Sequence, residues 1–155
     1  MARHHNAEAK PDVLTLAVYS NDAGLRSQVR LALGDMLAPD LPPSRVVEFA
    51  TPAAVITALD DGGYDCVVLD AEATPLGGMG LAHQIRDEID DAPPLVMLVA
   101  RPVDAWLATW SRADAVAPLP VDPLTLPELV AGVIRAARAG TLVSQVTVPG
   151  AASRH

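Results

Sequence analysis

The sequence predicts an α/β fold in which helices cover both faces of a five-stranded parallel sheet. Apolar runs that suit buried strands alternate five times with segments whose apolar residues recur at helical spacing. Half of the 155 residues are hydrophobic, whereas only 3% are aromatic, so Ala, Val, Leu and Ile must build the core. The central apolar runs also lack polar alternation, which is typical of parallel strands buried on both faces.

The first predicted strand, at 13–19, is followed by a helix. Four apolar residues recur at intervals of three and four and form one face of that helix: Leu25, Val29, Leu33 and Met36. Three prolines in the segment APDLPPS then end this first unit, because proline cannot continue a helix or a central strand.

The second predicted strand is at 45–50, and its helix has clear start and stop signals. A threonine hydroxyl caps a helix and proline suits the first turn, so Thr51 and Pro52 mark the start. Asp61 and the two glycines after it mark the end.

Three further units complete the alternation. Their strands are predicted at 65–70, 94–100 and 114–119. The helices that follow them are predicted at 80–89, 103–112 and 126–139. Five such units, joined by right-handed crossovers, form a doubly wound, flavodoxin-like sheet.

One domain is expected at 12–139, between two tails. The tail at 1–11 is polar and is expected to be flexible. The tail at 140–155 has no helical partner, and its segment TLVSQVTV alternates like a lone strand. We expect this tail either to stay without fixed structure or to pair with another chain.

Charge and composition exclude several classes of function. The net charge of −8 and a single lysine, Lys10, oppose binding to nucleic acid, which depends on clustered basic residues. No apolar run approaches the roughly 20 residues of a membrane span, so no direct membrane insertion is expected. The polar N-terminus does not resemble a signal peptide, and the lone Cys66 allows no internal disulfide. We therefore expect a cytoplasmic location.

Two motifs give the chain a family resemblance. VVLD, ending in Asp70, precedes a Pro/Gly loop, and PLPVDPLTLPELV leads into the last helix. Together, and in this order, they resemble the receiver domains of bacterial two-component response regulators over nearly the whole of 12–139. The resemblance implies that Asp70 corresponds to the phospho-acceptor. It also implies Mg²⁺, held by this carboxylate and by an acidic pair after the first strand.

The acidic pair is missing from this chain. Ser20 and Asn21 stand where the resemblance places the two carboxylates, and Asp22 follows one residue later. Asp22 is expected to cap the first helix, where an acidic side chain suits the helix dipole. Without the pair, Asp70 is expected to accept hydrogen bonds from the backbone or from Asn21.

The remaining switch positions also depart from the family. Ala100 stands where the family has a hydroxyl residue, and Leu119 stands where it has a lysine. Neither side chain can bind a phosphoryl oxygen. Arg101 offers a positive charge beside Ala100, but we expect it to be solvated or paired with a surface acid. The site is therefore interpreted as degenerate, with no metal and no cofactor, and Mg²⁺ is expected only if Asp70 is functional.

The predicted fourth helix carries an unusual pair of aromatic residues. Trp106 and Trp110 lie one turn apart on one stripe, so both indoles cannot easily join the core. They are either exposed interface anchors or are packed under a neighbouring helix. Arg112, Arg135 and Arg138 are candidate rim charges for the same interface.

The leading interpretation is a stand-alone receiver that acts as a protein-interaction or accessory subunit, is not an enzyme and works without phosphorylation. The Ala/Pro/Arg-rich, lysine-poor sequence further resembles stand-alone receiver-like proteins of mycobacteria associated with respiratory complex I. That resemblance implies complex I subunits on the cytoplasmic side as partners, and a location peripheral to the inner membrane. The main alternative is a working phospho-acceptor with Asp70 as its acceptor. A small-ligand binder is disfavoured because SNDAGLR offers only one glycine.

Overall fold

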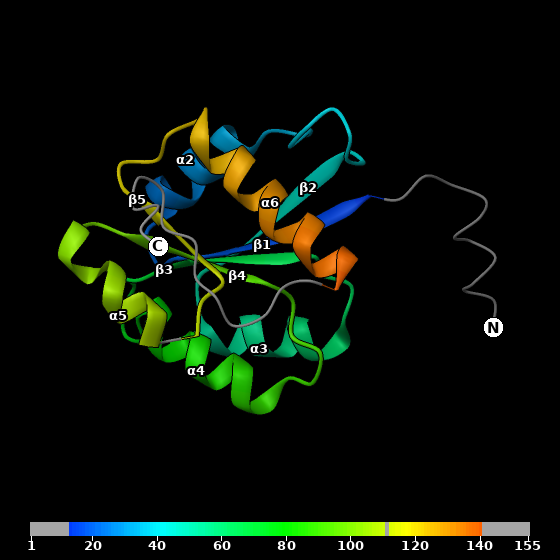
Figure 1. Cartoon of the computed structure of the whole chain (residues 1–155). Coiled ribbons are helices and arrows are strands. Elements are labelled where there is room, and N and C mark those ends of the chain that lie inside the picture. The colour runs from blue at the N-terminus through cyan, green and yellow to red at the C-terminus, as the bar shows by residue number, and fades with distance from the viewer. Residues whose placement is uncertain (1–12, 111, 141–155) are drawn as a thin grey trace.

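Five parallel strands form the centre of the structure, a computed structural model that describes residues 13–110 and 112–140 (Figure 1). The strands lie in the order β2-β1-β3-β4-β5. Their bounds are β1 (Leu14–Tyr19), β2 (Ser44–Phe49), β3 (Cys66–Asp70), β4 (Leu95–Val99) and β5 (Ala115–Pro118). Every neighbouring pair is parallel, so the predicted sheet is confirmed.

Helices cover both faces of the sheet. Their bounds are α2 (Ala23–Leu33), α3 (Pro52–Asp61), α4 (Gly78–Glu88), α5 (Ala105–Trp110) and α6 (Thr125–Ala139), with a short 3-10 turn η1 (Pro102–Asp104) before α5. Figure 1 shows α2 and α6 on one face, and α3, α4 and α5 on the other. This is the doubly wound arrangement that the alternation predicts.

The sheet divides the core into two halves. Side chains of successive strand residues point to opposite faces, so each strand contributes to both halves. On β3, Cys66 and Val68 join the cluster that contains residues of α2 and α6. Val67 and Leu69 join the cluster that contains residues of α3 and α4. All four are fully buried, as expected of a central parallel strand.

Two of the predicted helix signals are confirmed. The carboxylate of Asp22 accepts hydrogen bonds from the backbone N–H groups of Gly24 and Leu25, at 2.8 and 3.3 Å, and so caps α2. The Thr51 hydroxyl accepts a hydrogen bond from the N–H of Ala54, and Pro52 opens α3.

Two predicted helices are shorter than expected. α2 ends at Leu33 because Gly34 has a φ of 63°, and Met36 lies beyond the helix, half exposed and bridged to Pro43. The helix predicted at 103–112 is divided into η1 and α5, and Arg112 has a φ of 68°, which is incompatible with a continuing helix.

Among the described residues, no helix combines the length and the apolar character needed to cross a membrane. The predicted N-terminal tail lies outside the described residues, and of the predicted C-terminal tail only Gly140 is described.

Candidate functional site

A cleft of about 430 Å³ opens at the carboxyl ends of the strands. This is the edge at which α/β sheets of this kind bind ligands. Asp70 ends β3, and Asn21 follows β1 by two residues. The lining residues come from three βα connections and from α2: Asn21, Asp22, Gly24, Leu25, Gln28, Asp70, Glu72, Thr74 and Leu119.

The carboxylate of Asp70 has a hydrogen-bond donor on each oxygen. The Ser20 hydroxyl donates to Oδ2 over 2.7 Å, and the backbone N–H of Glu72 donates to Oδ1 over 2.8 Å. The side chain of Asp70 is buried, with a relative exposure of only 3%. The chain itself therefore supplies the hydrogen-bond donors that a buried acidic side chain requires.

Of the two donors expected for Asp70, the backbone or Asn21, the structure shows the backbone. Tyr19 lies beside Leu69 in the β1–β3 register, so the next residues along, Ser20 and Asp70, become neighbours. Asn21 lies one residue further out, and its Oδ1 accepts a hydrogen bond from the N–H of Thr74 over 2.9 Å. The backbone contribution to Asp70, from Glu72, is as expected.

Tyr19, which was not selected from the sequence, also contacts the connection between β3 and α4, to which Thr74 belongs. Its hydroxyl donates to the carbonyl oxygen of Leu76 over 2.6 Å. Burial raises the pKa of this hydroxyl, and the negative charge of Asp70 raises it further. A tyrosine inside a buried strand needs a polar partner, and this requirement was the available signal. Tyr19 and Asn21 therefore tie the β3–α4 connection to the end of β1.

Arg26 brings a positive charge to the rear of the site. Its Nη1 donates to the backbone carbonyl of Ser20 over 2.7 Å, and its Nε pairs with Glu48 over 3.0 Å. The Ser20 hydroxyl in turn accepts a hydrogen bond from the N–H of Asp22 over 3.0 Å. Arg26 was not predicted, because it lies on α2 and its partner Glu48 lies on β2, 22 residues away. The guanidinium is engaged by these two groups and not by the carboxylate of Asp70.

The donor set does not fit the Mg²⁺ site that the resemblance implies. Mg²⁺ prefers oxygen ligands in near-octahedral geometry, usually including carboxylates. The Ser20 position supplies a hydroxyl that donates to Asp70 in place of a carboxylate, Asp22 caps α2, and the Asn21 oxygen accepts from Thr74. Across 13–110 and 112–140, no group of three or more His, Cys, Asp or Glu side chains is placed to hold a metal ion.

The other two departures lie at the ends of β4 and β5. Ala100 is exposed directly after β4, where its methyl group offers no hydrogen bond. Leu119 lines the cleft, and its N–H donates to the carbonyl of Val99 over 2.8 Å. The Leu119–Pro120 peptide bond is cis. Arg101 pairs with Asp104 through two contacts of 3.1 Å. The partner is acidic, as expected, but it is buried and not a surface acid.

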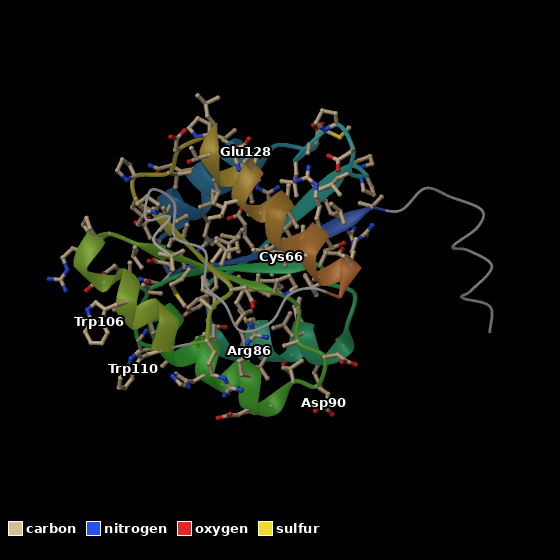
Figure 2. All side chains as sticks on the ribbon, in the orientation of Figure 1. Cys66, Arg86, Asp90, Trp106, Trp110 and Glu128 are labelled. Carbon is tan, nitrogen blue, oxygen red and sulfur yellow. The ribbon has the colours of Figure 1, made fainter. Side chains whose placement is uncertain are left out.

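The two tryptophans of α5 are exposed. Trp106 is 56% and Trp110 is 71% exposed, and their rings meet edge to face with centroids 6.1 Å apart. Figure 2 shows both indoles on the outer side of α5. Of the two alternatives from the sequence, the structure therefore favours exposed indoles over packing beneath a neighbouring helix.

The predicted rim charges do not gather around the tryptophans. Arg112 follows α5, is exposed and lies 3.5 Å from the carboxylate of Asp87. Arg135 and Arg138 lie on α6, in the opposite helical layer (Figure 1). Arg135 binds Asp40 through contacts of 2.6 and 2.9 Å, so it faces the connection between α2 and β2. Only Arg112 is placed to accompany the indoles.

Comparison with known proteins gives a consistent picture. No family model matches the chain. Two proteins of Mycobacterium tuberculosis, from strains CDC 1551 and H37Rv, are described as uncharacterized response regulatory proteins. Each is 50% identical over 123 residues, which cover 79% of this chain and 92% of the relative.

Solved structures match the fold at low identity. The receiver domain of the Francisella response regulator 1452 has a TM-score of 0.68 at 14% identity, covering 80% of this chain and 98% of its own. A CheY-like receiver domain from Methylobacillus flagellatus has a TM-score of 0.66 at 15% identity, covering 79% and 99%. The BeF3-activated DrrB receiver domain has a TM-score of 0.65 at 18% identity, covering 80% and 99%.

Proposed function

This chain belongs to the response-regulator receiver family, and from that premise we propose that it acts as a protein-interaction module independent of phosphorylation at Asp70. In this proposal the fold presents a docking surface and the chain carries out no chemical reaction. The degenerate cleft and the exposed indoles of α5 support the two halves of the proposal.

The hydrogen bond from Ser20 to Asp70 carries the argument for phosphorylation independence. A carboxylate becomes an effective nucleophile toward an anionic phosphoryl donor only when a cation offsets the accumulating charge, and hydrogen bonds to its oxygens withdraw electron density from the attacking atom. Both oxygens of Asp70 already accept hydrogen bonds from Ser20 and from the Glu72 backbone. The position beside Ser20 is the neutral Asn21, which adds no carboxylate for a cation.

The two positions at the ends of β4 and β5 that the family uses carry no side chain that would hold an added phosphoryl group, and the nearby Arg101 is paired with Asp104. Ala100 has no hydroxyl, and Leu119 has no charge. A phosphoryl group on Asp70 would therefore gain neither of the contacts that commonly stabilise such an anion, a hydrogen-bond donor or a fixed cation. We propose that this chain acts by binding within a complex and not by a change in its phosphorylation state.

The docking half of the proposal rests on Trp106 and Trp110. Tryptophan is enriched among the few residues that dominate binding energy at protein interfaces. Both indoles are exposed on a chain with only these two tryptophans. Arg112, in the same part of the structure, adds a charge at the edge of this surface.

We further propose that the partner is a protein and not a nucleic acid, because the net charge of −8 repels phosphates. Complex I subunits on the cytoplasmic side are the proposed partners, supported by the resemblance in composition alone. Under this proposal the protein is cytoplasmic and reaches the inner membrane only through its partner. Copurification from the native cell, followed by identification of the bound subunits, tests this choice.

A direct test of phosphorylation independence is incubation with acetyl phosphate and Mg²⁺, followed by intact-mass measurement. We expect the unmodified mass. Stoichiometric addition of one phosphoryl group, abolished in Asp70→Asn, would contradict the proposal and establish Asp70 as a working acceptor. The position of Asp70 at the carboxyl end of β3, lining the cleft, is the observation that favours this second function.

A further inference from the structure

A second exposed apolar surface lies on the opposite helical layer from the tryptophans. Leu124 is 82% exposed and Leu31 is 78% exposed, more than any other large hydrophobic side chain of the described residues. A shallow groove of about 260 Å³ lies beside them, lined by Gln28, Leu31, Ala32, Val121 and Pro123. We call this surface, including Leu124, the α2–α6 groove. Side chains this apolar rarely gather at a surface that stays uncovered.

The outer side of α6 extends from the C-terminal end of this helix to its N-terminal end, which lies beside the α2–α6 groove. Five of its exposed residues recur at intervals of three and four and form this side: Thr125, Glu128, Gly132, Arg135 and Ala139. A Cβ added at Gly132 would meet no described heavy atom within 4 Å. Glycine inside a helix costs about 1 kcal/mol relative to alanine. No close contact within the described structure explains why this position carries glycine despite that cost. A chain segment lying against this side of α6 would make use of the space that Gly132 leaves.

The chain leaves α6 in a conformation that turns away from the helix axis. Gly140 is left-handed, with φ 75° and ψ 18°, and its N–H donates to the carbonyl groups of Ala136 and Ala137. The 15 residues of α6 span about 22 Å at 1.5 Å per residue. About seven extended residues cover the same distance. The segment after Gly140 is therefore long enough to return to Leu124 by about residue 147.

The sequence of this segment suits an apolar groove. In TLVSQVTV, at 141–148, one side of an extended chain carries Leu142, Ser144, Val146 and Val148, and the other carries Thr141, Val143, Gln145 and Thr147. The first side is therefore the more apolar of the two, above all at its end. No residue from 141 to 153 is charged. We propose that segment 141–148 folds back along the outer side of α6 and covers the α2–α6 groove with Val146 and Val148.

The tether favours this occupant over a second copy of the chain. A segment joined by a short linker experiences an effective concentration in the millimolar range, whereas another copy must bind from dilute solution. Two copies would also each carry the net charge of −8 and repel one another. The weak contacts of a few valines with a shallow groove are therefore best matched by the chain's own tail.

A paramagnetic label near the segment tests the proposal in the full chain. Cys66 is fully buried and burial raises the pKa of its thiol, so it resists maleimide reagents. A nitroxide can thus be placed selectively at Gly150→Cys. We expect it to broaden the amide signals of residues 28–32 and 121–124, compared with the reduced label. Signals of α3, on the opposite face of the sheet, serve as the internal reference.

Matched variants decide whether the contact is specific. Val146→Asp with Val148→Asp should abolish the broadening, whereas Gln145→Asp with Thr147→Asp, on the other side of the segment, should preserve it. Sharp signals at 28–32 and 121–124 in the labelled chain would overturn the proposal. So would broadening that appears only when labelled protein is mixed with unlabelled ¹⁵N protein, because that result identifies a second copy as the occupant. Equal effects of the two double variants would also overturn it.

Discussion

The Oγ of Ser20 lies 2.7 Å from Oδ2 of Asp70 and donates a hydrogen bond to it. Both side chains are buried, at 1% and 3% exposure, and they come from the ends of the neighbouring strands β1 and β3. The hydroxyl also accepts the backbone N–H of Asp22, so it links the cap of α2 to the buried carboxylate. At the carboxyl edge of the sheet, this serine thus has a structural role.

We expect Ser20→Ala to destabilise the fold by about 1–3 kcal/mol, because it leaves one oxygen of a buried carboxylate without its donor. The free energy of unfolding in urea, monitored by circular dichroism, measures this effect. Ser27→Ala, an exposed serine on α2, is the matched control and should change stability by less than about 0.5 kcal/mol. Equal stability of the two variants would show that the hydrogen bond is energetically unimportant.

Replacing the four departures should create a phosphorylation site. The variant Ser20→Asp/Asn21→Asp/Ala100→Thr/Leu119→Lys supplies the carboxylates, hydroxyl and cation that a phosphoryl anion and its metal ion require. We expect this variant to gain one phosphoryl group from acetyl phosphate with Mg²⁺, while the unchanged chain does not. Addition of Asp70→Asn should abolish the gain. An unmodified mass in the folded quadruple variant would show that other features of the loops also block the reaction.

Loss of the indoles should weaken partner binding. Each tryptophan at the centre of an interface contributes about 2 kcal/mol or more, which corresponds to about a thirtyfold change in affinity. We therefore expect Trp106→Ala/Trp110→Ala to lose the proteins that copurify with the unchanged chain. Arg135→Ala, on the opposite layer and paired with Asp40, is the control and should retain them. Retention of every partner by the folded double variant would show that another surface binds.

Acid should remove the stabilisation provided by Glu48. Hydrogen bonds from Arg30 and then from Arg26 lower the pKa of this carboxyl below its ordinary value. A lowered pKa in the folded state contributes stability above the unfolded pKa, and this stability is lost as the pH falls through the folded pKa. Glu48→Gln should therefore cost up to about 1 kcal/mol near pH 7 and progressively less below about pH 4.

Urea unfolding of the Glu48→Gln variant at several pH values measures this dependence. Asp60→Asn, at an exposed carboxylate near the end of α3, removes the same charge elsewhere and is the matched control. A difference between Glu48→Gln and the unchanged chain that stays constant from pH 7 to pH 3 would contradict the assignment to this ion pair.

Local signals predicted much of the fold because the determinants are close in sequence. The cap at Asp22 and the start of α3 at Thr51 and Pro52 follow from residue type and spacing alone, and the structure confirms them. Met36 was wrongly assigned to the first helix because its spacing suits a helix, whereas the left-handed Gly34 ends α2 before it. Periodicity identifies a face, but a stop residue decides where that face ends.

The contacts of the site were harder to predict because they depend on the register between distant strands. Tyr19 pairs with Leu69, and only this register makes Ser20, rather than Asn21, the partner of Asp70. Arg135 and Asp40 are 95 residues apart, so neither spacing nor composition pairs them. The residues at the site could be selected from the sequence, whereas the partner of each residue could not.

The edge-to-face pair of Trp106 and Trp110 also determines what the intrinsic fluorescence of this protein reports. These are the only two tryptophans in the chain, and both lie outside the core. We therefore expect the folded protein to emit close to the wavelength of solvated indole, and unfolding of the core to shift that emission only slightly. A blue shift therefore signals that a ligand has covered α5, and the unfolding of the sheet must be followed by another optical signal.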